Sequence, residues 1–493
     1  MPFDDKIKLI KKNLTALLIS EMLTRVMMLV FTIILARTYG KEQFGVYALA
    51  LSIGGLFEIF FNMGLNTVFI QRVVGEKKPL QEELSTFLPL RILLSLASFA
   101  CFIVFIILMG KNAATMEALA LGGLYYTIAS MVGFLWASFD AKQQMQYTAG
   151  IKLFQHIIIF VLGMFFIYYG YSISTIVGTY VIAICLAGLA TIIIIHKYFT
   201  HIRPRIMTQK WKEIIHKGWP IALSGAFVFV YSYLDTIIIS LNQGEQAVGL
   251  YQASYKIIGT LFILSSIINQ AYFPSLIESH HQDKDKLQHI FDKTLKSVFF
   301  WSIPISIGGA MLSERIILFI FGPEYTGAIA VFTILIWNCI IYFASSAMTT
   351  LLYALGKQRE TLKVFFIGAA VNTALNLYII PKYGIEGAAI TTLAAESAVL
   401  IGIYLLVKNH IKVKIIKHIW MPLVSAAFMA LALSYINIER MAAVLTTINL
   451  VKPLFGIFES LILTVAFGGA VYFIVYFGLK QTSSKARTHL NKK

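Results

Sequence analysis

Apolar residues occupy this chain in long stretches that short polar segments interrupt. Each stretch has about 20 residues or more, and an α-helix of that length crosses the hydrocarbon core of a bilayer. The fourteen stretches lie at residues 14–36, 45–70, 86–109, 116–138, 149–169, 172–195, 218–240, 250–275, 295–320, 326–354, 361–380, 385–407, 418–436 and 453–478. The pattern predicts an all-α polytopic membrane protein with about 14 transmembrane helices.

One phrase in this pattern occurs twice. Residues 32–47 read TIILARTYGKEQFGVY, and residues 236–251 read TIIISLNQGEQAVGLY. In both copies an apolar run ends at a Gly-containing turn, and the next apolar run begins with glycine, an aliphatic residue and tyrosine. The two copies align without a gap. The Tyr-Gly pair at 169–170 likewise resembles the pair at 383–384. The first twelve stretches are therefore predicted to form two six-helix bundles related by a pseudo-two-fold axis, followed by two extra C-terminal helices.

This repeat divides the chain into three expected parts. Residues 1–200 form the first bundle, residues 201–410 the second, and residues 411–493 the two additional helices with a basic tail. The connector at 196–217 is basic, and its C-terminal part is predicted to be a short amphipathic helix at the membrane surface.

Glycine and tyrosine recur at fixed places in the repeated phrase. Gly40 and Gly244 permit a tight turn because glycine has no Cβ. Tyr47 and Tyr251 are predicted to anchor helix ends at the outer membrane interface, where tyrosine is enriched. We therefore expect these four residues to be structural and to mark the seam between the bundles.

Composition supports a membrane location. Hydrophobic residues make up 58% of the 493 residues and charged residues only 13%, whereas soluble domains carry about 25% charged residues. The net charge is +17, but most lysines and arginines fall on one side of the membrane when the N-terminus is placed inside. This asymmetry predicts cytoplasmic termini in the inner (plasma) membrane, and it argues against a nucleic-acid partner.

Sequence motifs of enzymes are absent. The chain contains no G-x-x-x-x-G-K-[ST] phosphate loop, no H-E-x-x-H and no G-x-S-x-G. Its three cysteines lie apart within apolar stretches and have no zinc-binding spacing. We therefore expect a transporter rather than an enzyme, without a cofactor or metal site, and with H⁺ or Na⁺ as possible coupling ions.

Charged and amide side chains inside the apolar stretches are the candidate functional residues, since burying them in lipid is costly. They are Glu21, Arg25, Glu58, Asn62, Arg91, Asp235, Lys256 and Glu396. Arginine grips phosphate with two hydrogen bonds and lysine acts as a point charge. Arg25, Arg91 and Lys256 are therefore candidates for binding an anionic substrate, with Asn62 as a polar neighbour.

The acidic residues of this set have a second predicted task. Glu21, Glu58, Asp235 and Glu396 could line the cavity or bind a coupling cation or proton. The alternative is internal pairing, Glu21 with Arg25 and Asp235 with Lys256, in which each pair is a neutral structural contact. The sequence leaves these alternatives open.

The segment at 35–50, LARTYGKEQFGVYALA, resembles the phrase after the first helix of polysaccharide-unit flippases. These proteins belong to the multidrug/oligosaccharidyl-lipid/polysaccharide exporter superfamily. The resemblance implies twelve helices in two halves, plus a further pair that forms a lipid groove in some relatives. It also implies transport of a lipid-linked oligosaccharide, usually on undecaprenyl (pyro)phosphate, from the inner to the outer leaflet. Arg25 and Lys256 fall where such flippases often carry cavity cations.

We therefore expect an alternating-access flippase for surface polysaccharide biosynthesis. Its expected partners are the lipid-linked oligosaccharide, membrane lipid, and the polysaccharide polymerase and glycosyltransferases of the same pathway. One alternative is a cation-coupled multidrug exporter of the same superfamily, which would favour acidic over basic cavity residues. The other is a membrane glycan polymerase or ligase, which would need a large outer loop with catalytic charges, and the predicted outer loops are short.

Overall fold

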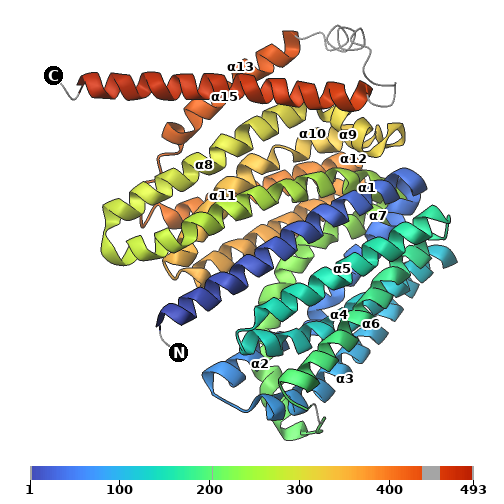
Figure 1. The fold of residues 1–493 in the computed structure, drawn as a ribbon. Helices are drawn as coiled ribbons and strands as arrows, with labels where there is room; N and C mark the ends of the chain where they lie inside the picture. The colour runs from blue at the N-terminus through green and yellow to red at the C-terminus, as the bar shows by residue number, and fades with distance from the viewer. Residues whose placement is uncertain (1–2, 202–203, 436–455, 491–493) are drawn as a thin grey trace. The chain divides into compact units, whose positions relative to one another are not determined.

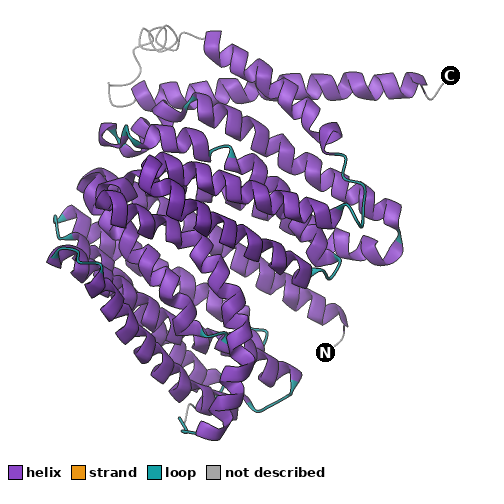
Figure 2. Cartoon of the chain, turned by 180° about the vertical axis from the view of Figure 1, so that it is seen from behind, coloured by secondary structure: helices purple, strands orange, loops and turns teal. Residues whose placement is uncertain are grey.

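The computed structural model describes residues 3–201, 204–435 and 456–490. Every regular element in these ranges is helical (Figures 1 and 2). The chain divides into two compact units: Met1–Gln252 with Asn376–Gly384, and Ala253–Leu375 with Ile385–Lys493.

The first unit contains five complete long helices, two short helical elements, the first part of α7 and residues 376–384 of α12. Its elements are α1 (Phe3–Asn62), α2 (Leu65–Ile70), the π-helix η1 (Gln71–Gly75), α3 (Leu80–Leu108), α4 (Ala113–Ala141), α5 (Met145–Tyr168), α6 (Ile173–Tyr198) and the first part of α7 (Thr208–Gln282).

The second unit continues α7 and adds the remaining helices. These are α8 (Lys284–Met311), α9 (Ser313–Phe321), the 3-10 helix η2 (Pro323–Tyr325), α10 (Ala328–Leu335), α11 (Asn338–Ala354), most of α12 (Gln358–Val407), α13 (Ile415–Tyr435) and α15 (Gly456–Leu490). In α13 and α15, the side chains of His418 and Tyr472 bond to α8, at Asp292 Oδ1 (3.0 Å) and the Phe300 carbonyl (2.7 Å). The two extra C-terminal helices are thus attached to α8.

The predicted all-α polytopic architecture is confirmed. Within the described ranges, nine helices are long and apolar enough to cross a membrane, or ten if α8 and α9, bent by 79°, form one span. Three of the long helices each contain two predicted stretches, because α1, α7 and α12 continue through a kink at Gly40, Gly244 and Gly384.

The kinks at Gly40 and Gly244 have the same backbone geometry. Gly40 has φ 70° and ψ 176°, and Gly244 has φ 79° and ψ −176°. This combination of positive φ and extended ψ is open only to glycine. The repeated phrase therefore encodes the same sharp bend twice.

The two copies of the phrase also touch each other within the first unit. A Cβ at Gly45 would lie 1.8 Å from the Glu245 carbonyl oxygen, and a Cβ at Gly249 would lie 1.9 Å from the Lys41 carbonyl oxygen. Glu245 and Lys41 occupy equivalent positions in the two copies. Only glycine allows the two backbones to approach so closely.

The prediction that Tyr47 and Tyr251 anchor helix ends at the membrane interface is wrong. Both side chains are buried. The Tyr47 hydroxyl lies 2.5 Å from the Tyr180 hydroxyl, and the Tyr251 hydroxyl donates to Asp235 Oδ2 at 2.5 Å. A tyrosine at this point of a helix can face inward when a partner satisfies its hydroxyl, and the sequence does not reveal which way the helix faces.

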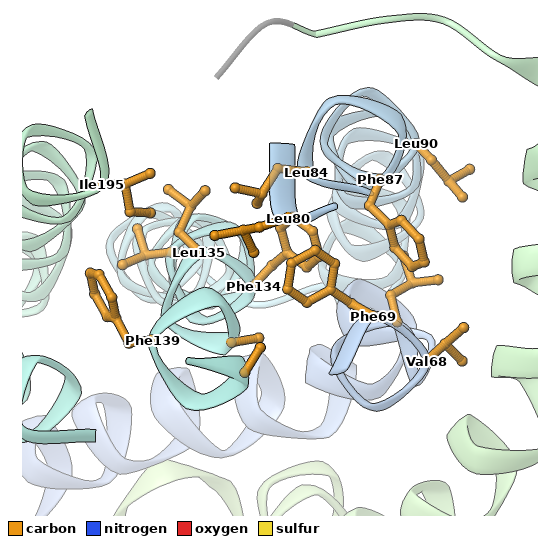
Figure 3. Packing of buried hydrophobic residues seen from close by; sticks show 14 of the residues in the cluster. Val68, Phe69, Leu80, Leu84, Phe87, Leu90, Phe134, Leu135, Phe139 and Ile195 are labelled. Atoms are coloured by element: carbon orange, nitrogen blue, oxygen red, sulfur yellow. The ribbon is translucent and has the colours of Figure 1, made fainter. Parts of the chain in front are cut away.

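An aromatic cluster fixes α2, α3 and α4 in the first unit (Figure 3). The ring of Phe69 lies 5.6 Å from that of Phe87 and 5.0 Å from that of Phe134, both edge to face. Edge-to-face contacts of this kind add to the gain from apolar burial. The cluster holds the part of α4 from which polar side chains face a cavity.

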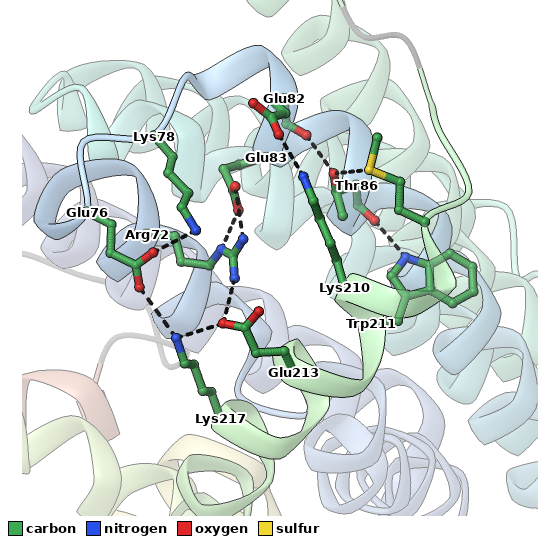
Figure 4. A network of polar contacts seen from close by, with 11 residues as sticks. Arg72, Glu76, Lys78, Glu82, Glu83, Thr86, Lys210, Trp211, Glu213 and Lys217 are labelled. Carbon is green, nitrogen blue, oxygen red and sulfur yellow. Dashed lines mark hydrogen bonds and ion pairs between the residues drawn. The ribbon is translucent and has the colours of Figure 1, made fainter.

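The connector between the predicted bundles is helical at its C-terminal end, where it forms the first turns of α7. Polar contacts attach it to the segment around η1 and the start of α3 (Figure 4). Buried Arg72 bonds Glu83 at 2.7 Å and Glu213 at 3.3 Å. Lys217 pairs with Glu213 at 2.9 Å and Glu76 at 3.5 Å. These residues form what we call the connector clamp.

Candidate functional site

A cavity of about 600 Å³ opens within the first unit. Side chains from α1, α2, α4, α5 and α6 line it. Three of the predicted site residues, Glu21, Arg25 and Glu58, meet here although Glu58 lies far from the other two in sequence. The kink at Gly40 makes this possible, because it folds the second half of α1 back beside the first.

Arg25 and Glu21 form the internal pair that the sequence offered as an alternative. The Arg25 Nη2 atom lies 2.6 Å from Glu21 Oε1, and the residues are one helical turn apart on α1. Both side chains are about half exposed, at 48% and 57%. The pair neutralises the Arg25 charge at the cavity wall while leaving both groups accessible to a ligand.

Lys152 is a second cation in the cavity, and the sequence interpretation missed it. Its ammonium lies 5.4 Å from the ring centroid of Trp136, in a cation–π contact. The Trp136 indole N–H donates to Thr191 Oγ1 at 3.0 Å. Lys152, Gln155 and His156 line the cavity together because they are spaced i, i+3, i+4 on α5. That spacing was the available signal, but Lys152 lies near the end of its stretch, where lysine is ordinary.

Two further carboxylates line the cavity. Glu58 is partly exposed and lies on the second half of α1. Asp140 accepts a hydrogen bond from Thr148 Oγ1 at 3.3 Å across the α4–α5 turn. Together with Glu21 they give the described lining three acidic groups against the cations Arg25 and Lys152. The sign of the charge therefore does not by itself separate an oligosaccharide flippase from a drug exporter.

Arg91 and Asn62 lie outside this cavity. Arg91 is completely buried. Its Nη1 donates to the Asn62 carbonyl at 2.5 Å and to Asn62 Oδ1 at 3.1 Å, and its Nη2 donates to the Ser130 carbonyl at 2.6 Å. These bonds tie α3 to the C-terminal end of α1 and to α4. Substrate binding by the two residues stays a prediction.

Asp235 is buried on α7, and its carboxylate accepts hydrogen bonds from residues of the same helix. Its Oδ1 accepts from the Thr236 amide at 2.7 Å and its Oδ2 from the Tyr251 hydroxyl at 2.5 Å. Lys256 and Glu396 lie in the second unit, both partly exposed. The pairing of Asp235 with Lys256 stays a prediction because the two residues fall in different units.

The chain resembles several membrane proteins in sequence. The chain is 25% identical over 283 residues to a membrane protein of Methanocaldococcus jannaschii, and the match covers 54% of each chain. It is 24% identical over 410 residues to the capsular polysaccharide biosynthesis protein CapF of Staphylococcus aureus, covering 81% of this chain and 99% of CapF. It is 22% identical over 241 residues to the lipid II flippase MurJ of Bacillus subtilis, covering 46% and 44%.

Solved structures share the fold. The inward closed conformation of the lipid II flippase MurJ matches with a TM-score of 0.76 at 15% identity, over 94% of this chain and 98% of that one. An inward-facing multidrug resistance transporter of the MOP superfamily matches with a TM-score of 0.64 at 14% identity, over 78% and 94%. A profile of the family described as polysaccharide biosynthesis protein matches residues 10–280, more than half of the chain. The chain therefore belongs to the polysaccharide biosynthesis protein family.

Proposed function

We propose that this protein is a flippase that moves a lipid-linked oligosaccharide across the membrane for polysaccharide biosynthesis. The observation that carries the proposal is the cavity of about 600 Å³, which opens among membrane-spanning helices and presents paired charges, amides and a tryptophan. A polar headgroup needs such a lining to enter the membrane, because hydrocarbon offers it no hydrogen bonds. Membership of the polysaccharide biosynthesis protein family supports a glycan as the cargo.

Two kinds of charge support the finer features of the proposal, which are the carrier lipid and the direction of transport: the cations of the cavity and the distribution of lysine and arginine between the loops. The carrier is undecaprenyl (pyro)phosphate, whose anionic group suits cavity cations. Transport runs from the inner to the outer leaflet of the plasma membrane by alternating access, with both termini in the cytoplasm, as the bias of lysine and arginine favours. The partners are the glycosyltransferases that make the unit and the polymerase that consumes it.

Residue roles follow from the same proposal. Arg25 and Lys256 supply cations to the headgroup, and Glu58 carries a coupling proton or Na⁺. Glu58 is favoured for coupling because it lines the cavity and interacts with Arg91 and Lys152 through space, without a direct ion pair to either among the described residues. Glu21 positions Arg25 through their ion pair. Asn62 and Arg91 are kept in the proposal as further substrate-binding candidates, and Asp235 and Glu396 as further candidates for coupling or for lining the cavity.

A deletion strain tests the proposal. Lipid-linked units should accumulate where a membrane-impermeant periodate reagent cannot oxidise their sugars in intact spheroplasts, and become oxidisable after lysis. Re-expression should restore oxidation in intact cells. Units that accumulate in the oxidisable pool would instead indicate a polymerase or ligase. Normal glycan assembly together with increased drug susceptibility would indicate a multidrug exporter.

A further inference from the structure

The two cations that line the cavity are held in different ways. Arg25 is paired with Glu21 at 2.6 Å. Lys152 rests instead over the face of Trp136 at 5.4 Å. It interacts electrostatically with Glu58 and Asp140, which also line the cavity, but among the described residues it forms no direct ion pair like that of Arg25 with Glu21. Of the two cations, Lys152 is therefore the one whose ammonium is not bonded to a carboxylate.

We propose that Lys152 receives the phosphate of the substrate by moving its ammonium from the face of Trp136 to the phosphate oxygens. This inference rests on the proposed function and names the residue that binds the anionic group. A cation–π contact at an accessible site is weaker than charge-assisted hydrogen bonds to an oxyanion. The exchange is therefore favourable, and it breaks no ion pair.

The neighbours of Lys152 strengthen this assignment. His156 Nδ1 lies 2.7 Å from the Lys152 carbonyl oxygen, which can only accept, so this nitrogen must donate. In neutral His156 the other ring nitrogen is then an acceptor and cannot bind phosphate. Gln155 donates to the Tyr125 hydroxyl at 3.3 Å. Among these neighbours on α5, only the Lys152 ammonium offers positive charge.

Trp136 gives the proposal an optical signal. Its indole N–H is fixed by Thr191 at 3.0 Å, so that movement of Lys152 changes the electrostatic field over a ring that stays in place. Indole fluorescence should respond to this change. Replacing Trp136 by phenylalanine removes the signal and identifies its source among the 6 tryptophans of the chain.

The experiment titrates the purified full-length protein in detergent with a short-chain polyprenyl phosphate that carries no sugar. The neutral polyprenol and inorganic phosphate are titrated in parallel, which separates headgroup recognition on a lipid from binding of the lipid chain or of free phosphate. Lys152→Ala should weaken polyprenyl phosphate binding about tenfold or more, as expected when a charge-assisted hydrogen bond is lost. Lys152→Arg should restore most of the affinity, and polyprenol binding should not change.

Lys197 provides the matched control. It lies 5.2 Å from the ring centroid of Tyr198, at the exposed end of α6 and outside the cavity lining. Lys197→Ala should bind polyprenyl phosphate as the wild type does. The assignment would be overturned if Lys152→Ala bound polyprenyl phosphate with wild-type affinity, or if a tenfold loss of that affinity occurred only in Arg25→Ala. It would also be overturned if the wild-type protein bound polyprenol or free phosphate more tightly than polyprenyl phosphate.

The sugar-free ligand separates this test from that of the proposed function. The titration measures phosphate recognition in purified protein, whereas the periodate assay measures movement of glycan in cells. Loss of transport in cells with unchanged binding by Lys152→Ala would overturn the Lys152 assignment alone. Lys152-dependent binding in a protein whose deletion leaves glycan topology unchanged would overturn the flippase proposal alone.

Discussion

Arg91 and Arg25, both in the first unit, differ in whether their hydrogen bonds connect separate helices. Arg91 is withdrawn from the cavity and bonds to backbone oxygens at a helix end and at mid-helix. Arg25 lines the cavity and bonds to one side chain on its own helix. Three acceptors around Arg91 fix the position of three helices, whereas the Arg25 pair can open without disturbing packing.

Arg91→Met should therefore lower stability. The substitution removes the guanidinium donor from the partly buried Asn62 carbonyl and from the buried Ser130 carbonyl, at about 1–3 kcal/mol for a group left unsatisfied. Arg91→Lys should recover only part of this loss, because one ammonium cannot reproduce the planar fork of donors. Thermal unfolding in detergent measures both variants. The exposed Arg315 is the control, and Arg315→Met should stay within about 0.5 kcal/mol of wild type. An Arg91→Met protein that unfolds at the wild-type temperature would contradict the structural assignment.

The depth of a residue along its helix was predictable from sequence, but its direction around the helix was not. Depth placed Glu21, Arg25 and Glu58 within the membrane, and the structure brings them to one cavity. Direction decides whether Tyr251 faces lipid or a buried carboxylate, and nothing local to its stretch encodes that. Lys152 was missed for the complementary reason, because a lysine near a helix end needs no special partner.

At the scale of elements, glycine sets where helices bend and where they touch. Gly40 and Gly244 bend α1 and α7, while Gly45 and Gly249 bring the same two helices into contact. The sequence predicted the bends, because a glycine between two apolar runs is a turn signal. It could not predict the contact, because nothing in one helix specifies the backbone of another.

Gly249→Ala tests this contact. The added Cβ would lie 1.9 Å from the Lys41 carbonyl oxygen, so that the backbones must separate. Overpacking of this kind costs about 1–3 kcal/mol, which should appear as a lower thermal unfolding temperature. Gly45→Ala should behave alike, because its Cβ meets the equivalent carbonyl.

Gly259→Ala on the same helix as Gly249 is the matched control. No atom lies within 4 Å of its Cβ position, and alanine there should be neutral or stabilising by about 0.5–1 kcal/mol. Equal stability of Gly249→Ala and Gly259→Ala would argue against the contact.

At the scale of the whole molecule, the fold repeats but the chemistry does not. The offset that aligns the two phrases pairs Arg25 with Phe229 and Lys256 with Ser52. The offset that aligns the two Tyr-Gly pairs matches Lys152 with Phe366. Duplication explains why the helical architecture could be predicted from one sequence. The charged cavity lies in one half of the repeat, and an asymmetric substrate needs no second copy of it.

The connector clamp should stabilise the first unit through one buried ion pair. The Arg72 and Glu83 side chains are only 3% and 1% exposed. Arg72→Met leaves the Glu83 carboxylate buried without its partner, which costs about 3–5 kcal/mol. Replacing both residues, as Arg72→Met with Glu83→Leu, should recover much of that loss.

The control is Lys78→Met, which breaks only an exposed pair with Glu76 and should cost at most about 1 kcal/mol. If Arg72→Met and Lys78→Met proved equally stable in thermal unfolding, the buried pair would not be what holds the clamp.

The exposed side of the clamp should make the connector sensitive to acid. The hydrogen bond from Lys217 lowers the pKa of Glu213 below its ordinary value of 4.5, and the hydrogen bond from Lys78 does the same for Glu76. A carboxyl group whose pKa is lower in the folded state stabilises that state above the unfolded pKa, and this contribution disappears as the pH falls through the folded pKa. Hydrogen exchange of amides 208–217, corrected for intrinsic rates, should therefore accelerate as the pH falls below about 4.5.

The double variant Glu76→Gln with Glu213→Gln isolates the cause of this acid sensitivity. Its amides at 208–217 should exchange faster than those of the wild type at neutral pH, because the ion pairs of Glu76 and Glu213 are gone at every pH. Their protection should then fall less on acidification than in the wild type, and the pair of Lys210 with Glu82 at 2.7 Å remains as an acid-sensitive contact of the segment. Glu360→Gln, which removes an exposed pair with Lys357 in the second unit, should keep the wild-type acid response of the connector. An undiminished acid response in the double variant would mean that carboxylates other than Glu76 and Glu213 control the attachment of the connector.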